Sequence, residues 1–127
     1  MKRTVCVDLD ATLARYDGWK GVDHIGEPLP GAQEFMEQLC RLANVVVFTT
    51  RTKADDESLG RNGKTKYELA SLVESWLKNH DIPYHEVYVG QGKPIASAYV
   101  DDRAVSIKAN PNEEDYSKAL EAVRGLL

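Results

Sequence analysis

The stretch that most constrains this chain is Thr4–Leu13, which reads TVCVDLDATL. Its apolar run Val5–Val7 is typical of a strand, and it leads directly into Asp8 and Asp10. Side chains alternate along an extended backbone, so two carboxylates two positions apart point to the same side. Such close like charges raise the pKa of one carboxyl group unless a cation or a shared proton relieves the repulsion. The pattern therefore predicts a site of chemistry where a first strand ends, which is where open α/β sheets bind ligands.

Length, charge and cysteine content restrict the class of protein. The 127 residues suffice for a single domain spanning 1–127, and 43% hydrophobic with 28% charged residues is ordinary for a globular protein. The formal net charge of −4 argues against a general nucleic-acid-binding surface, although it leaves room for a local basic pocket. Cys6 and Cys40 fall in a predicted strand and a predicted helix, which favours reduced thiols. With no signal-peptide core and no apolar run approaching about 18 residues, we expect a cytoplasmic protein without a membrane partner.

Periodicity predicts alternating helices and strands along the rest of the chain. An apolar stripe after Pro30-Gly31 predicts a helix to about Ala43, and Thr65 with Glu68 forms a capping box that opens a second helix. Helices between buried strands imply right-handed crossovers and a mostly parallel sheet. We therefore predict a three-layer α/β/α sandwich with a Rossmann-like five-stranded sheet. The strands after the first are expected at Val45–Phe48, Glu86–Val89, Ala98–Val100 and Ala104–Ile107, and a closing helix is expected after its N-cap at Asn112.

Polar clusters follow the predicted strands at the points where they end. Thr49 and Thr50 follow VVVF, Lys93 lies in the turn GQGKP after the third strand, and Asp101-Asp102 follow AYV. The carboxyl ends of parallel strands meet at one edge of a sheet, so these groups are expected to converge with the first acidic pair.

The chemistry of this set points to phosphoryl groups. Four carboxylates without histidine or cysteine at zinc spacing suit Mg²⁺, which prefers a few carboxylates together with waters and phosphate oxygens. A threonine hydroxyl and a lysine ammonium supply the hydrogen-bond donors that a phosphoryl group needs. A carboxylate can attack phosphorus and form an aspartyl-phosphate, and a second one two residues on is placed for proton transfer. The residues together predict phosphoryl transfer.

The four motifs resemble those of the haloacid dehalogenase-like (HAD) phosphatase superfamily in order and in strand context, over nearly the whole chain. The resemblance implies that Asp8 is the nucleophile and a Mg²⁺ ligand. It implies that Asp10 is the general acid/base and binds Mg²⁺ through its main-chain carbonyl. Ala11 departs from the glycine that is common at this position in the family. The resemblance further implies phosphoryl contacts from Thr49 and Lys93, with Thr50 a weaker candidate, and Mg²⁺ contacts from Asp101 and from Asp102, directly or through water.

Members of this superfamily commonly carry a cap domain between motifs, and the intervals here are short. Ala14–Leu29 and Thr52–Lys64 are predicted to be irregular loops, so the chain resembles a capless member. The expected substrate is a phosphorylated small metabolite, a nucleotide or a phosphorylated nucleic-acid end. An open site fits a macromolecular or large substrate, such as a phosphorylated nucleic-acid end or a phosphoprotein. It also fits a small substrate covered by Tyr16, Trp19 and the second loop, or by a neighbouring subunit in a homo-oligomer. Lys53, Arg61, Lys64 and Lys66 could contact a phosphate-rich ligand or form a solvated face.

Three other functions share parts of this pattern. A receiver domain has acidic residues, threonine and lysine around Mg²⁺, but its phospho-acceptor aspartate follows a middle strand, where this chain has Thr49 and Thr50. A non-catalytic module could keep the same groups to bind phosphate and Mg²⁺. A phosphotransferase would use the same residues with an acceptor other than water, and the sequence does not separate it from a phosphatase.

Overall fold

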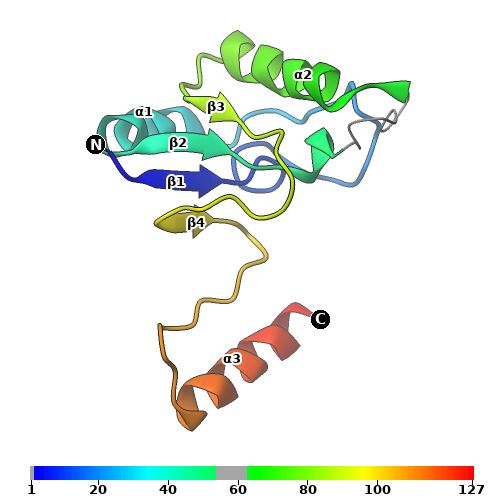
Figure 1. The fold of residues 1–127 in the computed structure, drawn as a ribbon. Helices are drawn as coiled ribbons and strands as arrows, with labels where there is room; N and C mark the ends of the chain where they lie inside the picture. Colours follow the sequence, from blue (N-terminus) through cyan, green and yellow to red (C-terminus); the bar gives the residue numbers. More distant parts are fainter. Residues whose placement is uncertain (1, 54–62) are drawn as a thin grey trace.

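Four parallel strands form one sheet in the order β3-β2-β1-β4, and three α-helices accompany it (Figure 1). The structure is a computed structural model that describes residues 2–53 and 63–127. The predicted α/β class with a parallel sheet is confirmed. The strands are β1 (Thr4–Val7), β2 (Asn44–Val47), β3 (Glu86–Val87) and β4 (Ala98–Val100), and the helices are α1 (Ala32–Leu42), the short 3-10 turn η1 (Thr50–Thr52), α2 (Lys66–Asn79) and α3 (Glu113–Leu126).

Strand register brings three strand ends together. β1 pairs with β2 from Thr4 opposite Asn44 to Val7 opposite Val47, and it pairs on its other side with β4. Two further backbone bonds extend this pairing past the strands. The Phe48 amide donates to the Val7 carbonyl at 2.9 Å, and the Asp8 amide donates to the Val100 carbonyl at 2.9 Å. The residues that follow β1, β2 and β4 therefore leave the sheet side by side at one edge.

The core lies between the sheet and the helices α1 and α2. Side chains alternate along each strand, so every second residue of β1 and β2 points toward these helices. One continuous cluster unites those residues with apolar side chains of both helices. The capping box predicted for Thr65 and Glu68 is present at the start of α2. Cys6 and Cys40 are free thiols, as predicted. The buried members of the cluster include Val7, Leu9, Met36, Val45, Val47, Val73, Trp76, Leu77 and Val87.

The prediction of a fifth strand at Ala104–Ile107 is wrong. Among the described residues the sheet has four strands, and this segment pairs with none of them. The segment follows β4, an edge strand of only three residues. A turn at Asp102-Arg103 instead directs the chain away from that edge (Figure 1). The segment has four residues, one of which is serine, so it buries too little apolar surface to stay paired with so short a strand.

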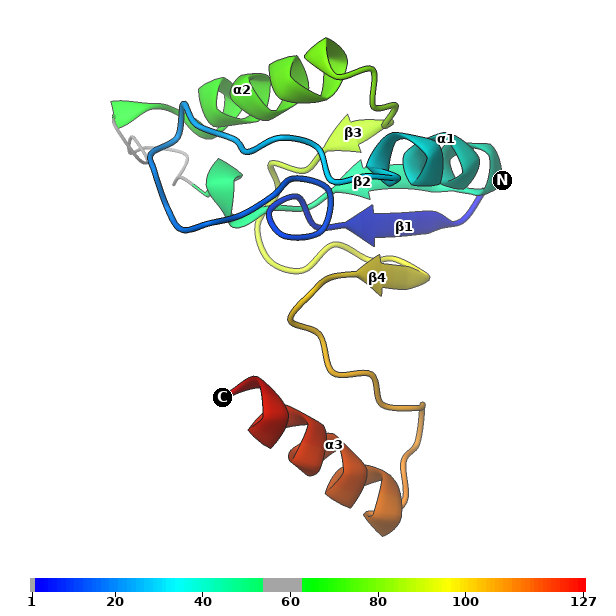
Figure 2. The ribbon, with the colours of Figure 1, turned by 180° about the vertical axis from the view of Figure 1, so that it is seen from behind.

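The closing helix forms as predicted but does not complete a third layer. Asn112 and Asp115 form a reciprocal capping box that begins α3. Figures 1 and 2 both show α3 standing apart from the sheet beyond β4. None of its residues is buried, and Tyr116 and Leu120 of its apolar stripe are 60% and 53% exposed. The three-layer sandwich that the sequence predicts is therefore not formed by this helix.

No helix of the described chain combines the length and the apolar character that crossing a membrane requires.

Candidate active site

The first acidic pair lies in a tight turn that follows β1. The Asp8 side chain turns back and accepts a hydrogen bond from the Leu9 amide at 2.8 Å. The chain then closes on itself, because the Ala11 amide donates to the Ala14 carbonyl at 2.8 Å. Ala11 has a φ of 66°, a left-handed conformation that favours glycine. The turn therefore forms with a Cβ at a position whose backbone conformation favours glycine.

Three carboxylates converge at the ends of β1 and β4. Asp8, Asp101 and Asp102 each offer an oxygen atom, and these atoms all lie within 4.8 Å of one another. The Asp8 amide bonded to Val100 fixes this proximity, because Asp101 follows Val100 directly. We call these three residues the acidic triad. The Asp101 carboxylate also accepts a hydrogen bond from the Arg103 amide at 2.7 Å, which orders the turn.

Burial and like charge change the proton affinity of the acidic triad. Desolvation by burial, followed by the charges of Asp101 and Asp102, raises the pKa of Asp8 to about 7, against the opposing hydrogen bond from the Leu9 amide. A carboxylate in this setting is unfavourable without a compensating cation. Oxygen ligands alone, close together and partly exposed, are the donor set that suits Mg²⁺. The residues present therefore fit a magnesium ion.

This pKa shift gives a pH dependence of stability in metal-free protein. The unfolded chain loses the Asp8 proton near pH 4, its ordinary value, whereas the folded protein keeps it to about pH 7. The folded state binds more protons in this window, so the contribution of Asp8 to the free energy of unfolding falls as pH rises from about 4 to 7. Thermal unfolding in EDTA should show this fall, and Asp8→Asn should remove it, whereas Asp17→Asn in the exposed loop should retain it. An unchanged pH profile in Asp8→Asn would contradict the pKa shift.

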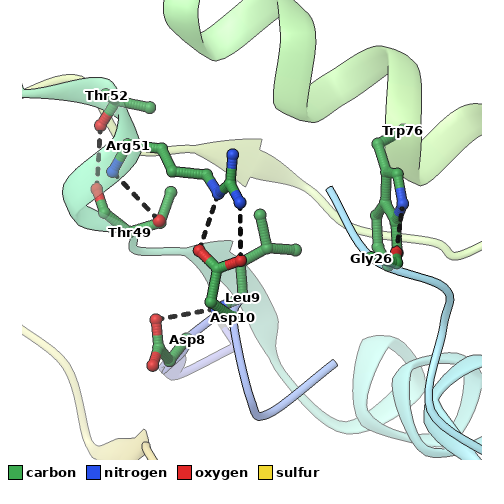
Figure 3. A network of polar contacts seen from close by, with 8 residues as sticks. All are labelled: Asp8, Leu9, Asp10, Gly26, Thr49, Arg51, Thr52 and Trp76. Atoms are coloured by element: carbon green, nitrogen blue, oxygen red, sulfur yellow. Dashed lines mark hydrogen bonds and ion pairs between the residues drawn. The ribbon is translucent and has the colours of Figure 1, made fainter. Parts of the chain in front are cut away.

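Asp10 lies apart from the acidic triad and faces a different partner. Arg51 donates from Nε and Nη2 to the two carboxylate oxygens of Asp10 at 2.7 and 2.8 Å (Figure 3). Figure 3 shows the Asp10 carboxylate turned toward Arg51 rather than toward the carboxylate of Asp8. Arg51 is not among the predicted site residues. The sequence feature that could have indicated it is its position directly after Thr49 and Thr50, at a strand end where the site was expected.

The two threonines after β2 differ in their environment. Thr49 is buried, and its hydroxyl accepts a hydrogen bond from the Arg51 amide at 3.2 Å while capping η1. Thr50 is exposed. Both line a cavity of about 330 Å³ together with Asp8, and we call it the central cavity. The structure thus brings together six of the seven predicted site residues in one cavity: Asp8, Asp10, Thr49, Thr50, Asp101 and Asp102.

Lys93 is the predicted site residue that does not line the central cavity. It is exposed, and its Nζ lies 4.4 Å from the centre of the Tyr99 ring, a cation–π contact. It lines a larger groove of about 870 Å³ beside β4. The groove and the central cavity share Asp8, Phe48, Lys53 and Asp101. Lys93 therefore lies in a groove that Asp8 also lines, with its ammonium on the Tyr99 ring.

Aromatic side chains of the loop between β1 and α1 form the rim. Tyr16 and Trp19 line the central cavity and are 37% and 44% exposed. The Trp19 ring lies over the Arg51 guanidinium, 4.9 Å from ring centre to Cζ. Lys53 also lines the cavity. Arg61 and most of the predicted Thr52–Lys64 loop lie outside the described residues.

Comparison with known proteins identifies the fold. No known family profile matches the sequence, and no curated protein matches it either. The chain is similar to a solved conserved protein from Bacteroides thetaiotaomicron, with a TM-score of 0.57, 16% identity, and 96% of this chain and 92% of that chain covered. It is also similar to a structural-genomics target from Vibrio cholerae, with a TM-score of 0.53, 26% identity, and 94% and 98% of the two chains covered. These likenesses support the α/β fold.

Proposed function

We propose that this protein is a Mg²⁺-dependent phosphoric monoester hydrolase of HAD type that works through an aspartyl-phosphate on Asp8. The observation that carries the proposal is the acidic triad at the ends of β1 and β4, in the same cavity as Thr49 and Asp10. Metal ligands, a nucleophile, a hydroxyl donor and a second carboxylate are the parts that phosphoryl transfer through a phospho-enzyme requires.

Asp8, Asp101 and Asp102 would hold the metal ion, with the Asp10 main-chain carbonyl as a further oxygen donor. Bound Mg²⁺ would neutralise charge on the phosphoryl oxygens and on the approaching carboxylate. The Thr49 hydroxyl would donate to a phosphoryl oxygen. Lys93 would complete the phosphoryl contacts by moving off the Tyr99 ring, a rotation that its exposed position permits.

The reaction would proceed in two displacements at phosphorus. In the first, an Asp8 carboxylate oxygen forms a bond to phosphorus while the bond to the leaving oxygen breaks, and Asp10 gives that oxygen a proton. In the second, water forms a bond to phosphorus while the bond to Asp8 breaks, and Asp10 takes the proton from the water. Asp8 and Asp10 return to their starting states, and inorganic phosphate and an alcohol are released.

The open cavity limits the substrate less than a cap would. Among the described residues the rim consists of loop side chains, chiefly Tyr16 and Trp19, and no separate cap folds over them. A small phosphorylated metabolite, a nucleotide or a phosphorylated nucleic-acid end would fit such a site. A second subunit in a homo-oligomer would be an alternative cover. We place this activity in the cytoplasm.

Trapping the phospho-enzyme tests the proposal. Asp10→Asn should still form the aspartyl-phosphate but break it down roughly 10² to 10⁴ times more slowly, because the water loses its general base. The variant mixed with Mg²⁺ and an aryl phosphate, quenched in acid and analysed by mass spectrometry should carry phosphate on the peptide that contains Asp8. The double variant Asp8→Asn/Asp10→Asn is the matched control and should carry none. Phosphate on any other residue, or equal labelling of the control, would contradict the proposal.

A further inference from the structure

Arg51 has an environment that is rare for an arginine side chain. It is only 5% exposed and lies in the turn η1 that follows β2. Together with Asp10 it lines a second cavity of about 220 Å³, which shares Asp10 and Tyr16 with the central cavity. Its Nε and Nη2 atoms make the two short bonds to Asp10, in the parallel two-bond geometry that fixes both groups. A carboxylate held in this way has lost its freedom to rotate.

Stability does not explain this buried pair well. Removing a guanidinium from water costs several kcal/mol, which its ion pair repays only if its other donors are satisfied. The Nη1 atom of Arg51 is buried without a hydrogen-bond partner in the described chain. A buried arginine with an unsatisfied donor, next to a cavity, is more readily understood as serving the site.

Arg51 is itself held from two further directions. Its amide donates to the Thr49 hydroxyl at 3.2 Å, so the backbone that carries it is tied to a predicted phosphoryl contact. Its guanidinium lies under the Trp19 ring at 4.9 Å. A planar group that lies against an aromatic ring and is bonded along one edge has a defined orientation. Trp19 at the rim therefore contacts Arg51, and Arg51 in turn binds Asp10. Figure 3 shows the contact between Arg51 and Asp10.

We propose that Arg51 is the positioning residue for Asp10: it sets the orientation in which Asp10 transfers protons, and Trp19 fixes Arg51. This inference rests on the proposed function. Arg51 would not contact the phosphoryl group, because it does not line the central cavity and its Nε and Nη2 donors are already bonded to Asp10. Each Asp10 oxygen keeps a second lone-pair direction for proton transfer.

The inference predicts an effect that depends on the leaving group. A phenolate leaves without help, whereas an alkoxide needs the proton that Asp10 supplies. Arg51→Met should therefore lower kcat roughly 10- to 100-fold for an alkyl phosphate such as glycerol phosphate, part of the 10² to 10⁴ that general acid catalysis contributes. The rate at which 4-nitrophenyl phosphate forms the phospho-enzyme should fall less than about 3-fold in the same variant. KM should stay within about 3-fold for both esters, because Arg51 binds neither.

Matched variants separate positioning from general damage. Arg51→Lys keeps the charge but not the two-bond geometry, so it should show the same leaving-group dependence in weaker form. Tyr84→Phe removes a hydrogen bond to Glu74 far from the site and should leave the ratio of the two rates unchanged. Adding Arg51→Met to Asp10→Asn should cause little further loss, since the two residues act as one unit.

The outcomes distinguish the inference from the function on which it rests. In one outcome the wild-type protein hydrolyses both esters and Asp10→Asn shows the leaving-group dependence, but Arg51→Met does not. The inference is then wrong and the proposed function stands. Equal losses for both esters in Arg51→Met would also overturn it, by assigning Arg51 a purely structural role. If the wild-type protein forms no phospho-enzyme and hydrolyses neither ester, the proposed function falls and the inference with it.

Discussion

Replacing Asp8 by asparagine should lower turnover of any phosphate ester by roughly 10⁴-fold or more, because the amide cannot attack phosphorus to form the aspartyl-phosphate. The fold should survive. Asp8 is only partly buried, and an amide oxygen can still accept the hydrogen bond that the Leu9 amide donates at 2.8 Å. Steady-state kinetics measures the loss of turnover, and circular dichroism measures whether the fold survives.

The control for this variant is a carboxylate of the same kind outside the site. Asp23→Asn changes an exposed aspartate in the loop between β1 and α1 and should keep turnover within about 2-fold, as is usual for a surface substitution. Retained turnover in a folded Asp8→Asn protein would exclude Asp8 as the nucleophile. Loss of turnover in both variants would point instead to a general electrostatic effect.

Replacing one of the two acidic-triad carboxylates that follow β4 should raise the Mg²⁺ concentration needed for half-maximal activity. For Asp101→Asn we expect an increase of roughly 10- to 100-fold or more, because one of three converging charges disappears and the loss of even a hydrogen-bond partner of a metal ligand weakens metal binding by about that much. Isothermal titration with Mg²⁺, or activity measured against free Mg²⁺, gives the shift directly. Asp102→Asn should give a smaller shift if it binds the metal through water and an equal one if it binds directly.

Asp115→Asn provides the comparison for this experiment. Asp115 also lies among acidic residues, after Glu113 and Glu114 in the first turn of α3. It caps that helix and pairs with Lys108 at 3.4 Å, away from the central cavity. Its replacement should leave the Mg²⁺ dependence unchanged. An unaltered Mg²⁺ requirement in both Asp101→Asn and Asp102→Asn would remove the acidic triad as the metal site.

The site was predictable from sequence where local pattern and sheet topology act together. Strand periodicity located the ends of β1, β2 and β4, and parallel pairing then required the residues after them to meet. That reasoning placed Asp8, Thr49 and Asp101 correctly in one cavity. Both capping boxes follow from interactions over three residues, which makes the starts of α2 and α3 predictable as well.

The remaining features depend on contacts between segments far apart in the sequence. The Arg51–Asp10 pair joins residues separated by 41 positions, and no local pattern distinguishes it from two solvated charges. Lys93 was expected at the phosphoryl group, but the Tyr99 ring offers it a partner that only the turn geometry brings near. The apolar stripe of α3 predicts a buried face, yet a stripe does not specify where the chain beyond Asp102 will lead.

Hydrolysis of 4-nitrophenyl phosphate by the wild-type protein, as free Mg²⁺ is raised from EDTA conditions, tests the proposed metal site and nucleophile most directly. We predict no turnover in EDTA, saturable activation by Mg²⁺, and an acid-stable mass shift on the Asp8 peptide during turnover. Turnover that persists in EDTA would contradict the metal site. The absence of both turnover and phospho-enzyme at saturating Mg²⁺ would contradict the assignment of Asp8 as a nucleophile.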